Sequence, residues 1–220
     1  MTDYIKGVLD LLIQPTLETL YMMLFSTIFS VLFGFILGII LVITDKGNIC
    51  EKPKLNAVLG AIINIMRSVP FIILIIAIFP ISRFIVGTSI GPTAAIVPLS
   101  IAATPFVARV IESALKEVDW GVIEAALSLG ASTWQIIFKV MIPEAMPSII
   151  LGITLTIINI LGYTAMAGAI GGGGLGDLAI RYGYQRFETD ILIITIILLI
   201  IFVEIVQSIG NFLAKKCDKR

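Results

Sequence analysis

Five long apolar stretches alternate with short polar segments along the chain. Their approximate limits are 17–43, 57–80, 90–112, 147–169 and 189–213. Each is long enough to cross a bilayer, which takes about 20 residues as a helix. A spanning segment in lipid must satisfy its own backbone hydrogen bonds, and a helix does so internally. The pattern therefore predicts an all-α, polytopic membrane protein with five transmembrane helices.

The longest polar interruption, residues 112–148, predicts two short amphipathic helices between the third and fourth spans. Asp119 is a suitable N-cap, because its side-chain oxygen can accept a backbone N–H at a helix start. Gly130 is expected to end this first helix, since glycine readily takes a left-handed conformation just past a helix end.

The second helix of this segment is expected to start at Ser132, where Gln135 three residues later completes a capping-box pattern. Pro143 and Pro147 are expected to end it, because proline removes a backbone donor. At the other end of the chain, residues 1–15 predict a short amphipathic surface helix that ends near Pro15.

Composition supports the membrane interpretation. Hydrophobic residues make up 58% of the 220 residues and charged residues only 14%, whereas a soluble domain usually carries about a quarter charged residues. The formal net charge is zero, which gives no bulk electrostatic argument for binding nucleic acid. Histidine is absent, so the commonest metal ligand and general base is missing. We expect no catalytic residue, no metal site and no cofactor in this chain.

The distribution of Lys and Arg predicts the orientation, because cytoplasmic loops are enriched in these residues. The smaller set is Lys6, Arg83, Arg181 and Arg186. The larger set, which we assign to the cytoplasm, is Lys46, Lys52, Lys54, Arg67, Arg109, Lys116, Lys139, Lys215, Lys216, Lys219 and Arg220. This assignment predicts an outside N-terminus, a cytoplasmic C-terminus and a cytoplasmic location for residues 112–148.

One face of the fourth span is unusually small and polar. Asn159, Gly162, Tyr163 and Met166 recur at steps of three and four residues, which places them on one helix side. Such a face suits a solute path, and helix–helix packing with Asn159 as a hydrogen-bonding group is the alternative. Met166 lies near the outer end, and we hypothesise that two copies meet there as an apolar gate of a dimer.

A homodimer is expected because five helices enclose a solute path poorly, and most homo-oligomers are two-fold symmetric. Gly34 and Gly38 form a GxxxG pair that permits close helix contact, here assigned to packing within one subunit.

A glycine-rich segment follows the fourth span. Gly171, Gly173 and Gly176 formally match the dinucleotide fingerprint, but no strand precedes them, so we assign them to a tight turn. No P-loop pattern occurs in the chain, so any ATP that drives it must bind to another subunit.

Arginine and aromatic residues follow the glycines. Arg181, Tyr182, Tyr184 and Arg186 suit contact with another protein, and an interfacial aromatic belt is the simpler alternative for part of the set.

The polar segment resembles a known family. Glu124-Ala125-Ala126, Gly130 and Ile142-Pro143 resemble the EAA motif of ATP-binding-cassette (ABC) importer permeases. The resemblance implies that these residues form a cytoplasmic coupling helix that docks on an ATPase subunit. Many members have leucine before the proline of the motif, where this chain has Ile142, which keeps the bulk.

Residues 67–74, 105–132 and 162–190 extend the resemblance to the permeases of methionine-uptake ABC transporters. It implies a type I importer fold, a homodimer, two ATPase copies and an external substrate-binding protein, in the cell membrane of a bacterium. It also implies methionine as the substrate, with the enantiomer left open, and places Met166 at the gate.

We expect one permease domain over residues 1–220, with a coupling loop at about 113–146. A permease for another small amino acid or osmolyte and a passive channel remain alternative functions. An intramembrane enzyme would need clustered catalytic groups, whereas Glu204 stands alone in the last span.

Overall fold

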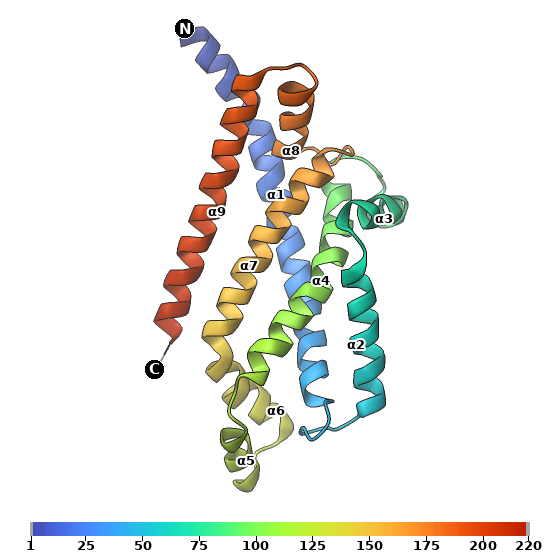
Figure 1. The fold of residues 1–220 in the computed structure, drawn as a ribbon, viewed down its shortest axis with the longest axis vertical. Helices are drawn as coiled ribbons and strands as arrows, with labels where there is room; N and C mark the ends of the chain where they lie inside the picture. Colours follow the sequence, from blue (N-terminus) through green and yellow to red (C-terminus); the bar gives the residue numbers. More distant parts are fainter. Residues whose placement is uncertain (1, 219–220) are drawn as a thin grey trace. The chain divides into compact units, whose positions relative to one another are not determined.

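The computed structural model describes residues 2–218, and these residues form helices joined by short turns (Figure 1). The α-helices are α1 (Thr2–Ile43), α2 (Pro53–Ser68), α3 (Phe71–Val86), α4 (Pro92–Lys116), α5 (Trp120–Ser128), α6 (Thr133–Ile136), α7 (Ile142–Gly168), α8 (Gly174–Leu178) and α9 (Thr189–Cys217). Two π-helical segments, η1 (Ile137–Met141) and η2 (Ala179–Tyr184), follow α6 and α8. The all-α prediction is confirmed.

Within residues 2–218, four helical stretches are long and apolar enough to cross a membrane. They are Asp10–Ile43 of α1, α4, the continuous run Thr133–Gly168, and α9. The expected span 57–80 consists of two helices, α2 and α3, which pass the length and hydropathy test together but are bent by 104° at a short break. Pro70 lies in the break with extended backbone, φ −57° and ψ 134°. Proline disfavours helical backbone in the residue before it and lacks an N–H of its own. Counted as one broken span, the pair makes five candidate spans.

Prolines did not end helices where the sequence predicted. α1 continues through Pro15, so the expected separate surface helix over residues 1–15 is wrong. The Thr19 hydroxyl donates a 3.0 Å hydrogen bond to the Pro15 carbonyl, one turn away. In lipid, losing one backbone bond costs less than unwinding a turn and exposing several groups, so a spanning helix tolerates proline.

The second helix of the polar segment likewise continues past both prolines. Pro143 and Pro147 lie within α7, so their expected role as helix stops is wrong. The π-helical segment η1 precedes them, and the Ile142 N–H bonds to the Ile137 carbonyl five residues back. The wider π turn shifts the hydrogen-bond register just before Pro143, so the helix can absorb the proline ring.

The contacts divide the chain into two compact units. The first comprises Met1–Ser30, Val69–Ala103 and Ile157–Val206, and the second comprises Val31–Ser68, Thr104–Thr156 and Gln207–Arg220. Buried clusters of the first unit centre on Met22, Leu99 and Ala167 and on Leu12, Leu175 and Ile191. The largest cluster of the second unit includes Val42, Ile111, Ile123, Ile137 and Met141. The expectation of one domain over residues 1–220 stays a prediction.

The GxxxG pair of α1 packs inside the second unit. A Cβ added at Gly34 would lie 2.5 Å from the Val107 Cβ, and one at Gly38 would lie 2.7 Å from the Ile111 Cβ. Both distances are shorter than carbon atoms tolerate, so only glycine lets α1 approach α4 this closely. The assignment of the pair to packing within one subunit is confirmed.

We expect Gly34→Ala to destabilise the protein by about 1–3 kcal/mol, because the added methyl overpacks the contact with Val107 and the Thr104 carbonyl. Gly7→Ala on the same helix is the matched control, since an added Cβ there meets nothing within 4 Å. Thermal unfolding of the purified chain in detergent measures both. An unchanged midpoint for Gly34→Ala would contradict the packing argument.

Candidate functional site

Two short helices form the loop between α4 and α7 (Figure 1). The Asp119 carboxylate accepts the Gly121 N–H at 2.6 Å and caps α5. Ser132 caps α6, and Gln135 accepts the Ser132 N–H at 2.8 Å in a reciprocal capping box. Both predicted helix starts are confirmed.

The first helix ends as predicted at Gly130, which has φ +78°. Its N–H bonds to the Leu127 carbonyl at 2.9 Å, and the Ala131 N–H bonds to the Ala126 carbonyl at 3.1 Å. This pair of bonds is the Schellman arrangement, which satisfies the last carbonyls of a helix and needs a left-handed residue. The loop is therefore a closed, hydrogen-bonded unit.

One side of α5 is anchored and the other is open. Ile123 is buried in the main cluster of the second unit, and Ala126 packs against the same cluster. Glu124 and Ala125 are exposed. The helix thus exposes Glu124 and Ala125, while its other side is packed against the core.

Large apolar side chains of the same loop are also exposed. Leu129 is 88% exposed and Trp134 is 68% exposed, and Phe138, Trp120 and Val122 are also open. The Trp134 and Phe138 rings stack with their centroids 5.7 Å apart. We call Glu124, Ala125, Leu129, Trp134 and Phe138 the loop surface. Its aromatic part was not predicted, although two large rings in a polar segment were a visible signal.

The remaining residues of the EAA-like pattern lie elsewhere. Ile142 is buried in the main cluster of the second unit, whereas Pro143 is exposed. The structure therefore does not bring Ile142 to the loop surface. Its buried position shows that it supports the loop through packing.

A network of charged side chains lies in the same unit. Glu112 is only 7% exposed, and its carboxylate pairs with Arg109 at 2.6 Å and with Lys116 at 2.9 Å. Lys116 also pairs with Asp45 at 2.7 Å, and this hydrogen bond holds the pKa of the Asp45 carboxyl below its usual range. A buried carboxylate is costly unless it is paired on both oxygens, as here.

Arg109 extends the network to α2. Its guanidinium donates to the Gly60 carbonyl at 3.1 Å and to the Asn64 side chain at 2.9 Å. The network therefore ties the end of α1, α2 and α4 together. Arg109 and Lys116 were expected only as loop charges, although their spacing of three and four residues from Glu112 indicated one helix face.

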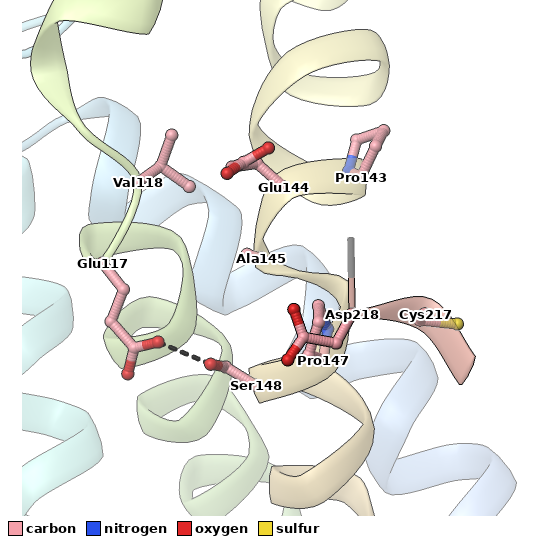
Figure 2. A pocket seen from close by; sticks show the side chains of 9 residues that line it. All are labelled: Glu117, Val118, Pro143, Glu144, Ala145, Pro147, Ser148, Cys217 and Asp218. Carbon is pink, nitrogen blue, oxygen red and sulfur yellow. Dashed lines mark hydrogen bonds between the residues drawn. The ribbon is translucent and has the colours of Figure 1, made fainter. Parts of the chain in front are cut away.

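A cavity of about 370 Å³ lies where α7 begins, between the end of α4 and the end of α9 (Figure 2). Glu117, Glu144 and Asp218 line it together with prolines of α7, and Ser148 donates a hydrogen bond to Glu117. Among residues 2–218, no group of three His, Cys, Asp or Glu side chains is arranged to hold a metal ion.

The predicted path face of α7 lies in the first unit. Asn159, Gly162 and Met166 are exposed, and Met166 shows 48% of its surface. Tyr163 differs, because it is half-buried and stacks on Phe71 with ring centroids 4.2 Å apart. The structure therefore keeps three of the four residues on one open face and gives Tyr163 a packing contact.

The glycine-rich segment turns tightly, as predicted. Gly171, Gly173 and Gly174 all have positive φ. The Glu18 carboxylate of α1 accepts the Gly174 N–H at 2.8 Å, and the Thr19 hydroxyl accepts the Leu175 N–H at 2.8 Å. These bonds give the first amides of α8 hydrogen-bond acceptors. They also give the Glu18 carboxylate, which lies on a spanning helix, a hydrogen-bond donor. No role was predicted for Glu18, because its partner Gly174 lies 156 residues away in the sequence.

The arginine and aromatic set lies on η2 and the turn after it. Arg181 forms an ion pair with Asp177, and the Arg186 guanidinium lies 4.3 Å from the centre of the Tyr182 ring. Tyr184 is 74% exposed. The two arginines are therefore held in place beside an open tyrosine.

Comparison with known proteins gives the family. The model of binding-protein-dependent transport system inner membrane components matches residues 34–219. The chain is 52% identical to the probable D-methionine transport system permease protein MetI of Vibrio cholerae, over 96% of this chain and 94% of that protein. It is 53% identical to the methionine import system permease protein MetP of Bacillus subtilis, over 93% and 92%.

A solved inward-facing structure of the MetNI methionine ABC transporter superposes with a TM-score of 0.95 at 41% identity, covering 97% of this chain and 99% of that one. The fold, the anchored loop and the matched family agree on a bacterial multi-pass membrane protein that is a transport subunit rather than an enzyme. The chain belongs to the family of binding-protein-dependent transport system inner membrane components.

Proposed function

We propose that this chain is the permease subunit of an ATP-driven methionine importer, in which a separate ATPase binds the loop between α4 and α7. The observation that supports this best is the loop surface. Glu124 and Ala125 are exposed on α5, whose other side packs into the core, and Leu129, Trp134 and Phe138 of the same loop are exposed too. Exposed apolar patches of this kind mark protein contacts. The similar proteins named as methionine permeases support the substrate.

Two copies of the chain form the translocation path, each bound to one ATPase subunit. ATP-driven association of the ATPases moves the loops, and the spanning helices alternate between inward-open and outward-open states. The loop connects directly to the path, because the helical run from Thr133 to Gly168 is unbroken. Asn159, Gly162 and Met166 line the path, and Tyr163 positions α7 through Phe71.

Methionine arrives from an external binding protein that contacts Arg181, Tyr182, Tyr184 and Arg186. The ion pair to Asp177 and the ring contact of Arg186 pre-order the arginines, which lowers the entropy lost on association. This arrangement requires the basic loops to be cytoplasmic and the N-terminus outside. Of the residues used for that orientation, Lys219, Arg220 and the Lys6 side chain lie outside the described part of the structure.

Labelled methionine uptake tests the function in an auxotroph without its own importers, expressing this chain with its ATPase and binding protein. We expect Glu124→Arg to abolish uptake without loss of membrane protein, because a cation replaces the acid at the ATPase contact. Glu51→Arg, at another exposed acid of the same unit, is the matched control and should retain uptake.

The competing functions give different results in this assay. Uptake that another solute competes for, with methionine ineffective, would overturn the substrate and keep the importer. Transport that proceeds without the ATPase would overturn the importer and favour a passive channel.

Met166→Ala tests the gate. We expect solute leak across membranes that contain the transporter, or ATP hydrolysis without transport, because the shorter side chain leaves the dimer axis open. Ile36→Ala, another exposed apolar residue of a spanning helix, serves as the control. Tight membranes and coupled hydrolysis in the Met166→Ala variant would remove the gate from the proposal.

A further inference from the structure

The first unit contains a groove of about 500 Å³ between α7 and α9. Its lining residues are Ile158, Leu161, Gly162, Ala165, Ile196, Leu199, Ile200, Val203 and Glu204. All but the last are apolar, so a single carboxylate faces an otherwise apolar groove.

Glu204 is unusual for its position. It is the only ionisable residue of α9 between Asp190 and Lys215. No hydrogen bond or ion pair to Glu204 is found within residues 2–218. An ionisable group in a spanning helix is costly in lipid and marks contact with water, an ion or a ligand. The groove therefore has to admit water or a cationic group.

The floor of the groove is open at Gly162. A Cβ added there would meet nothing within 4 Å, although glycines elsewhere in α7 are tightly packed, as at Gly152 and Gly168. The glycine at position 162 thus leaves open space in the groove and does not serve a close contact with another helix. Gly162 also belongs to the exposed face that carries Asn159 and Met166.

We infer that this groove is a transit site for an apolar amino acid, in which the Glu204 carboxylate accepts hydrogen bonds from the ligand's α-ammonium group. The ligand's apolar side chain lies against Leu161 and Ala165, over the space at Gly162. This inference rests on the proposed function and adds the substrate-contact residues to it.

The chemistry of the groove selects this occupant. A lipid acyl chain would fill the apolar part but leave the carboxylate without solvation, which costs several kcal/mol. A metal ion needs more than one charged ligand, and the other lining residues are apolar. An ammonium group joined to an apolar chain satisfies both parts of the groove at once.

Cysteine protection in the assembled transporter tests the site. Cys50 and Cys217 are replaced by serine, and Ala165→Cys places one thiol in the groove. We expect a membrane-impermeant thiol reagent to label it and added methionine to slow the labelling. Ile197→Cys, exposed on α9 but outside the groove, is the control that methionine should leave unchanged.

The charge is then tested directly. Glu204→Gln should raise the methionine concentration that gives half-protection by about tenfold or more, since a hydrogen bond between charged groups is worth about 1.5–3 kcal/mol. Glu204→Asp should return the half-protecting methionine concentration part of the way to that of the parent transporter. An unchanged amount of assembled transporter in the membrane and an unchanged thermal unfolding midpoint in Glu204→Gln would separate a ligand contact from a folding defect.

The outcomes separate the two proposals. If the parent transporter takes up no methionine, the proposed function fails. If it takes up methionine but Ala165→Cys resists the reagent or gains no protection, the transit site fails alone. Equal half-protection with Gln and Glu at position 204 would likewise overturn the role of the carboxylate.

Discussion

The hydrogen-bonding requirement of the backbone in lipid governs this molecule more than any single contact. A buried amide or carbonyl without a partner costs several kcal/mol in hydrocarbon, so each span keeps its helix even where the sequence offers a stop. α1 continues through Pro15 and α7 through Pro147 for this reason. At the start of α8, just after the glycine turn, side chains of α1 accept the free amides.

Each helix satisfies its own backbone hydrogen bonds, so packing between helices depends on how closely they approach. Hydrophobicity alone does not favour helix contact in lipid, so small residues and polar links supply the specificity. Gly34 and Gly38 bring α1 against α4, and the network around Glu112 joins α1, α2 and α4 by charge. The glycine contacts and the ion-pair network both join α1 to α4, which makes this part of the second unit a rigid support for the loop.

A rigid loop is what the proposed coupling to an ATPase requires. Capped at both ends and anchored through Ile123, α5 cannot yield when a partner pushes on its exposed side. In the proposed mechanism, the movement then passes to the continuous helical run that ends at Gly168. The π-helical segment η1 within this run is the place where the register can change, a frequent feature of functional helices.

The sequence by itself determined the helical class, the approximate spans, the caps of α5 and α6 and the glycine turn after α7. These depend on local rules: hydrophobic length, a capping oxygen within three residues, or a positive φ. The tertiary structure decided the break at Pro70, the survival of helices through Pro15 and Pro143, and the partners of Glu112 and Glu18. Such outcomes depend on atoms from distant parts of the chain, as when Glu18 accepts an amide of α8. Local sequence patterns contain no information on these contacts, because the free energy of burying a polar side chain depends on the partner that the fold places next to it.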